Sequence, residues 1–150
     1  MQPLIEEYLP GASPTNGLWA SLGFPSRGSK LHEYIRRNGL PFSFLEHLSR
    51  ETGLKVRVLS EAVGISRSTL ARRAKAGRLT CVESDRLYSI ATIFDAAIEL
   101  FEGDVLAVRD WMTSPVRGLD GKAPMKMLGT RVETRAVLDL IGQLEHGLPA

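Results

Sequence analysis

One long helix in the second half of the chain constrains the fold more than any other feature of the sequence. Thr80 and Glu83 have the spacing of a capping box, which satisfies free backbone N–H groups at the start of a helix. From there to Gly103, apolar residues recur at i, i+3 and i+4 spacing, which predicts a helix of about 20 residues, roughly 30 Å long. No stretch alternates as a half-buried strand does, so we expect an all-α fold. The apolar residues of this helix are Leu87, Ile90, Ala91, Phe94, Ile98 and Phe101.

Glycines and capping residues predict the remaining helices. One is expected from Ser29 to Gly39, one from about Ser43 to Gly53, and one after Asp104 that contains Trp111. A second capping box, Thr130 with Glu133, opens a last helix that ends before Gly147. Its apolar stripe is expected to pack on Trp111 and on the long helix. The stripe consists of Val137, Leu140, Ile141 and Leu144.

The first 28 residues are expected to form an arm without a long regular element, because they hold four of the eight prolines. The arm is nevertheless too apolar to be a solvated linker, since it carries Leu18, Trp19, Leu22 and Phe24. We expect these side chains to mediate self-association. The alternative, docking on the chain's own domain, stays open. With the short helix that follows, the arm makes an N-terminal unit over residues 1–40.

Residues 55–78 predict two short helices joined by a sharp turn. Gly64 permits the left-handed backbone conformation that such a turn needs, and Leu70 would fix the second helix onto the first. This stretch also contains seven basic residues against Glu61 alone, a net charge of +6, whereas the whole chain carries +2. Such a concentration favours a site for a polyanion. We therefore expect a helix-turn-helix DNA-binding domain over residues 41–102, the long helix included.

The second of these helices presents a small and basic face. At 100° per residue, Leu70 and Ala74 fall on one side, and the opposite side would face the major groove. We expect Arg67, Ser68 and Arg72 to reach base edges, and four other basic residues to lie near phosphates. Arg73 flanks the inner side, where it contacts DNA or pairs with Glu61. The phosphate contacts are assigned to Lys75, Arg78, Lys55 and Arg57. Two recognition helices about 34 Å apart imply a homodimer or a higher oligomer.

From Leu79 onward the sequence resembles the Xre/MbcA/ParS antitoxin family. The stretch LTCVESDRLYSIATIFDAAIELF matches the family's linking helix, and SPVRGLDGKAPMKMLGT with VLDLIGQLEHG matches its toxin-binding domain. The resemblance covers roughly residues 55–147. It implies a small helical toxin-binding domain, which we place at residues 103–150. It also implies an operon partner, usually a RES-domain toxin that depletes NAD⁺.

The resemblance also suggests where such a toxin would be contacted. The tail and the loop before the last helix are expected to offer groups that occupy or cover the toxin's active site. A pocket that binds anionic NAD⁺ should be basic, so Glu145 or the terminal carboxylate would sit where phosphate does. The expected toxin contacts are Lys122, Lys126, Glu145, His146, Gly147, Leu148, Pro149 and Ala150.

Several functional classes are not expected. The sequence shows no nucleophile motif, phosphate-binding loop or dinucleotide fingerprint, so we expect neither an enzyme nor a cofactor. The three histidines lack metal-ligand spacing, and one cysteine cannot form an intramolecular disulfide. No apolar run would span a membrane, so a cytoplasmic protein is expected. The rival functions are a stand-alone transcription regulator with a ligand- or partner-sensing C-terminal domain, and a structural partner without a DNA role.

Overall fold

The computed structural model describes Leu18, residues 22–23 and residues 29–147. Within these residues the fold is all-helical, and its only β-type pairings are the isolated bridges Pro41 to Arg78 and Val116 to Lys122. None of the described helices is long and apolar enough to cross a membrane. The elements are α3 (Ser29–Asn38), α4 (Phe42–Thr52), α5 (Val56–Val63), α6 (Arg67–Ala76), α7 (Cys81–Leu100), α8 (Val105–Thr113), the 3-10 turns η1 (Arg117–Leu119) and η2 (Pro124–Lys126), and α9 (Arg131–Glu145).

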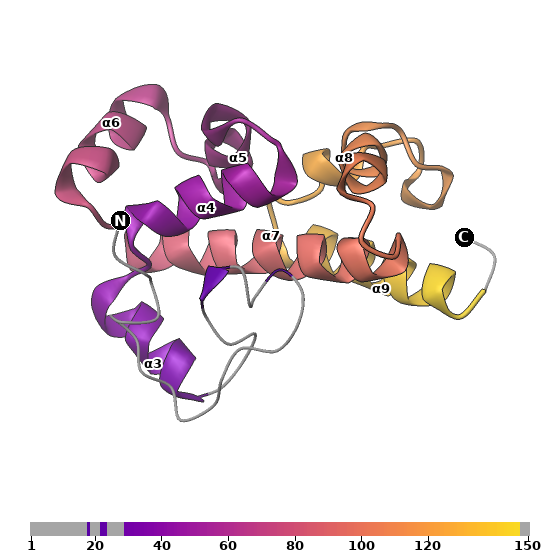
Figure 1. Ribbon diagram of the computed structural model, residues 1–150, viewed down its shortest axis with the longest axis horizontal. Helices are drawn as coiled ribbons and strands as arrows, with labels where there is room; N and C mark the ends of the chain where they lie inside the picture. Colours follow the sequence, from indigo (N-terminus) through magenta and orange to yellow (C-terminus); the bar gives the residue numbers. More distant parts are fainter. Residues whose placement is uncertain (1–17, 19–21, 24–28, 148–150) are drawn as a thin grey trace.

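Helix α7 is the axis of the molecule, and other elements pack along its length (Figure 1). Helices α4, α5 and α6 gather over its N-terminal half, α8 lies beside its C-terminal half, and α9 runs along it. The capping box at Thr80 and Glu83 is complete, as the sequence predicts. At Thr130 only half of the box forms. The Thr130 hydroxyl accepts from the Glu133 backbone N–H, but the Glu133 carboxylate accepts from the Thr130 hydroxyl and not from the Thr130 backbone N–H.

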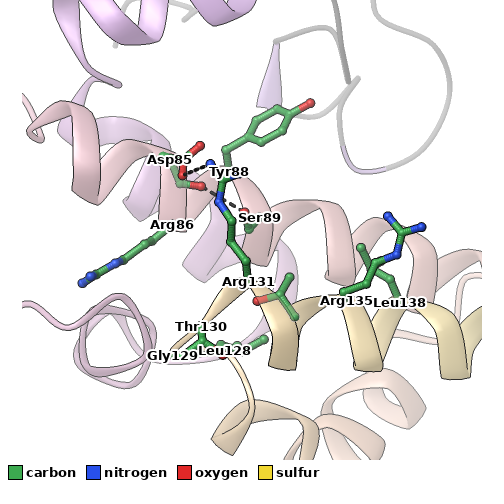
Figure 2. Close-up of a pocket in the computed structure, with 11 residues that line it drawn as sticks. Asp85, Arg86, Tyr88, Ser89, Leu128, Gly129, Thr130, Arg131, Arg135 and Leu138 are labelled. Carbon is green, nitrogen blue, oxygen red and sulfur yellow. Dashed lines mark hydrogen bonds and ion pairs between the residues drawn. The ribbon is translucent and has the colours of Figure 1, made fainter.

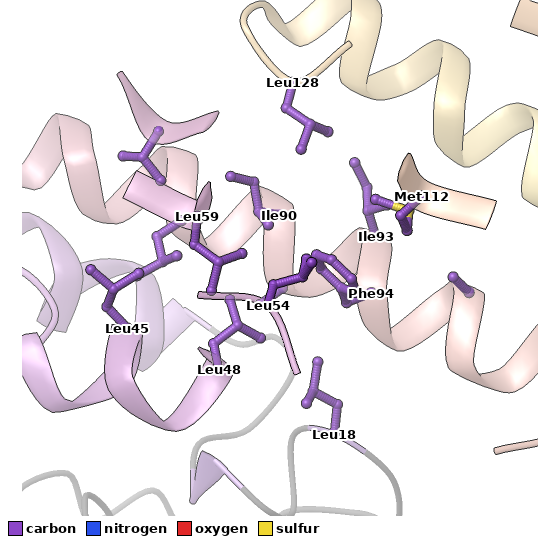
Figure 3. Packing of buried hydrophobic residues seen from close by; sticks show 14 of the residues in the cluster. Leu18, Leu45, Leu48, Leu54, Leu59, Ile90, Ile93, Phe94, Met112 and Leu128 are labelled. Carbon is purple, nitrogen blue, oxygen red and sulfur yellow. The ribbon is translucent and has the colours of Figure 1, made fainter. Parts of the chain in front are cut away.

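One continuous apolar core joins all these elements (Figure 3). Phe94 and Ile93 of α7 are fully buried at its centre, where side chains of α4 and α5 meet those of α8. Burying a side chain of this size contributes about 1.5–3 kcal/mol. The predicted stripe of α9 faces this core: Val137, Leu140 and Ile141 are buried and Leu144 is partly buried.

Part of the N-terminal arm also joins the core. Leu18 and Leu22 are buried, with 4% and 1% of their surface exposed. These two residues therefore dock on the chain's own domain, which is the alternative that the sequence leaves open. Trp19 and Phe24 lie outside the described residues, so the self-association of the arm stays a prediction.

Candidate nucleic-acid interface and partner-binding surfaces

Helix α6, the predicted recognition helix, leaves its basic face in solvent. No residue of α6 is fully buried, and the helix is attached to the core through the partly buried Leu70. Ser66 caps its first turn by accepting a hydrogen bond from the Thr69 backbone N–H. The side chains predicted to face the groove are all exposed, which leaves them accessible to a DNA duplex. They are Arg67, Ser68, Ala71, Arg72 and Lys75.

Arg72 is oriented by a neighbour on its own helix. Its Nη2 donates to the Thr69 hydroxyl at 3.1 Å, and that hydroxyl also lies 3.0 Å from the capping Ser66. A guanidinium has five N–H donors, so this one bond leaves donors for a bidentate contact to a base. The cap of α6 therefore orients the residue that we expect to read sequence.

Arg73 belongs to the fold rather than to the exposed face. Its Nε donates to Glu83 Oε1 at 2.7 Å and its Nη2 to Glu83 Oε2 at 3.1 Å. The structural alternative for Arg73 therefore holds, but its partner is Glu83 and not Glu61. Burial alone would raise the pKa of Glu83, but the hydrogen bonds from Arg73 and Thr80 lower it below its ordinary value. This bidentate pair joins the end of α6 to the capped start of α7.

Arg78 also has a structural role, and its predicted phosphate contact stays a prediction. Its Nη1 donates to the Tyr34 hydroxyl at 3.1 Å and to the Gly39 carbonyl at 3.0 Å, and its guanidinium lies 5.8 Å from the centre of the Tyr34 ring. The half-buried side chain thus holds the end of α3. Lys55 and Arg57 are exposed at the start of α5, and their phosphate contacts stay predictions.

The residues expected to contact a toxin form two separate groups. Lys122 and Lys126 are exposed around η2, whereas Glu145, His146 and Gly147 are exposed at the far end of α9. The 15 residues of α9 separate the two groups in the sequence. Leu148, Pro149 and Ala150 lie outside the described residues.

Some exposed apolar side chains of the C-terminal half are not evident from the sequence pattern. Leu106 on α8 is 64% exposed and Val132 on α9 is 81% exposed. Trp111 is half-buried, packs against the core and lies against Phe101 with ring centres 6.1 Å apart. An apolar residue on the outer face of an amphipathic helix is the signal that could have singled out Leu106 and Val132.

Clefts open on several sides of the described structure. The one in Figure 2, of about 460 Å³, lies between α7 and α9, and the exposed ion pair of Arg131 with Asp85 (3.7 Å) crosses it. A second, of about 490 Å³, separates α5 from η2 and is lined by Val58 and Met125 among others. Among the described residues, no group of three or more potential metal-ligating side chains occurs.

Comparison with known proteins identifies both halves of the chain. The model of the antitoxin Xre-like helix-turn-helix domain matches residues 33–91, and that of the antitoxin Xre/MbcA/ParS C-terminal toxin-binding domain matches residues 96–147. A protein named antitoxin Xre from Yersinia enterocolitica is 36% identical over 139 residues, which cover 91% of this chain and 93% of the relative. This chain belongs to the Xre antitoxin family.

A second relative of the Xre antitoxin family, from Photorhabdus laumondii, is 32% identical over 135 residues, 89% of this chain and 91% of the relative. The helix-turn-helix model ends and the toxin-binding model begins within α7, so one uninterrupted helix connects the two domains. The family confirms the predicted DNA-binding and toxin-binding domains. It also makes the chain a non-enzymatic regulator.

Proposed function

We propose that this chain neutralises a RES-domain, NAD⁺-depleting toxin and represses its own operon by binding a palindromic operator in the cytoplasm as a dimer or higher oligomer. The observation that supports the DNA half is the exposed basic face of α6, which carries Arg67, Arg72 and Lys75. Arg73 of the same helix pairs with Glu83, and Arg78, which follows the helix, bonds Gly39. The toxin half is supported by the resemblance to this antitoxin family and by the accessible end of α9.

Two substitutions on α6 test the operator interface. Arg72→Ala should cost about 1–3 kcal/mol of operator binding and relax the preference at one base pair, because it would remove a base contact. Lys75→Ala should weaken binding to every duplex and flatten the salt dependence by about one unit, because it would remove a phosphate contact. Arg135→Ala is the matched control, since Arg135 is exposed on α9 and pairs with Asp139 of the same helix. Unchanged operator affinity in both α6 variants would refute the assignment.

The toxin contact is tested at the end of α9. Deletion of residues 147–150, or Glu145→Arg, should weaken binding to the toxin encoded beside this gene and restore NAD⁺ loss, while DNA binding persists. Glu46→Arg on α4 is the control, because it makes the same charge change at an exposed site in the other domain. If both tail variants still silence the toxin, inhibition must come from another surface, and the loop at Lys122 and Lys126 is the next to substitute.

A further inference from the structure

Helix α5 is the first helix of the proposed DNA-binding pair. At its last residue and in the loop before it, a backbone carbonyl accepts a hydrogen bond from an arginine of another helix. Arg86 of α7 donates from Nη1 to the carbonyl of Val63, the last residue of α5, at 3.1 Å. Arg109 of α8 donates from Nη1 to the carbonyl of Gly53, in the link between α4 and α5, at 3.3 Å. Arg109 lies within the matched toxin-binding domain, so the contact joins the two domains.

Both guanidinium groups lie over a glycine. Gly53 and Gly64 have left-handed backbone, with φ of +74° and +88°. A Cβ atom at Gly53 would come within 2.6 Å of Arg109 Nη1, and one at Gly64 within 3.0 Å of Arg86 Nη1. A side chain at either position would therefore displace the arginine as well as strain the backbone. At each end of α5, a glycine without a side chain thus leaves room for an arginine.

The position of α5 determines that of the recognition helix. Only residues 64–66 connect α5 to α6, and the Ile65 N–H donates to the Ser60 carbonyl of α5 at 2.9 Å, which makes this turn short and rigid. A cleft of about 490 Å³ separates α5 from η2. The hydrogen bond from Arg109 to the Gly53 carbonyl links the two domains directly, at the loop that precedes α5.

We propose that Arg86 and Arg109 are positioning residues for operator binding, and that through Arg109 the toxin-binding domain sets the orientation of the helix-turn-helix. This inference deepens the proposed function, because it rests on α6 reading an operator. Neither arginine needs to touch DNA. Loss of Arg109 should instead leave α5 and α6 less well ordered before DNA arrives.

Hydrogen exchange on the full chain tests the positioning role without DNA. In Arg109→Ala, amides of α5 and of the turn to α6 should exchange about fivefold faster, the scale of one lost hydrogen bond, while amides of α9 keep their parent rates. Arg109→Lys should restore slow exchange, since a lysine also donates to a carbonyl. Arg117→Ala is the matched control, because Arg117 is an exposed arginine of the same domain. Exchange in Arg109→Ala that equals the control would overturn the proposal.

Operator binding provides the second readout, with a duplex from the region upstream of the gene and a random duplex as probes. Arg109→Ala should weaken upstream binding about fivefold without changing the salt slope, because no phosphate contact is lost. Gly53→Ala should do the same, whereas Gly103→Ala, at φ of +87° with nothing within 4 Å of its Cβ, should not. A changed salt slope would overturn the positioning role. If the parent chain does not prefer the upstream duplex, the proposed function fails, and the exchange experiment still decides the role of Arg109.

Discussion

Replacement of Ser84 by alanine should destabilise the protein through one buried backbone group. Ser84 lies on α7 with none of its surface exposed, and its hydroxyl oxygen accepts a hydrogen bond of 2.7 Å from the Leu40 backbone N–H. Leu40 is itself 1% exposed, between α3 and α4. In Ser84→Ala this N–H stays buried without a partner, while the cavity left is only the size of one oxygen atom. Leaving a buried donor unsatisfied costs about 1–3 kcal/mol.

Urea unfolding followed by circular dichroism measures this cost. For a chain of this size, about 2 kcal/mol corresponds to a fall in melting temperature of roughly 4–8 °C. The control is Ser89→Ala on the same helix, because the Ser89 hydroxyl only donates to the Asp85 carbonyl four residues earlier. That variant should stay within about 0.5 kcal/mol of the parent. A Ser84→Ala protein as stable as the Ser89→Ala control would show that the Leu40 N–H finds another partner, and would refute the reasoning.

Further substitutions separate structural from DNA-binding roles. Arg78→Ala should lower the free energy of unfolding by about 1–2 kcal/mol, because Arg78 bonds Tyr34 and Gly39. The salt slope of DNA binding should stay unchanged, and a slope reduced by one unit would instead support a phosphate contact of Arg78. Glu83→Gln should destabilise the protein at pH 7. Because the folded-state pKa of Glu83 is lowered, this difference should be complete above about pH 4.3 and vanish as the pH falls through the lowered value; a difference that grows in acid would contradict it. Removal of residues 1–28 should reduce the particle mass in light scattering if the arm mediates self-association, whereas an unchanged mass with lower stability would leave only docking of Leu18 and Leu22 on the core.

Most of the helices could be predicted from the sequence because their signals are local. A cap, a left-handed glycine and an apolar residue every three or four positions act within one or two turns of the chain. The complete box at Thr80 and the stop at Gly77 follow from residues at most four positions away. The basic charge of residues 55–78 is likewise a property of a short segment, and it alone predicts a nucleic-acid interface there.

The partners of individual charged groups depended on the tertiary structure. Arg73 pairs with Glu83, ten residues on, and Arg78 reaches Gly39, 39 residues back, because helix packing rather than sequence separation brings these atoms together. The same holds for Arg109 at Gly53, 56 residues away. A hydrogen bond forms only over a short range of donor–acceptor distances, so a small change in a helix crossing angle exchanges one partner for another. The sequence by itself thus determined the helices, the basic face of α6 and the family, whereas only the packing decided which arginines are held by the fold and which remain exposed.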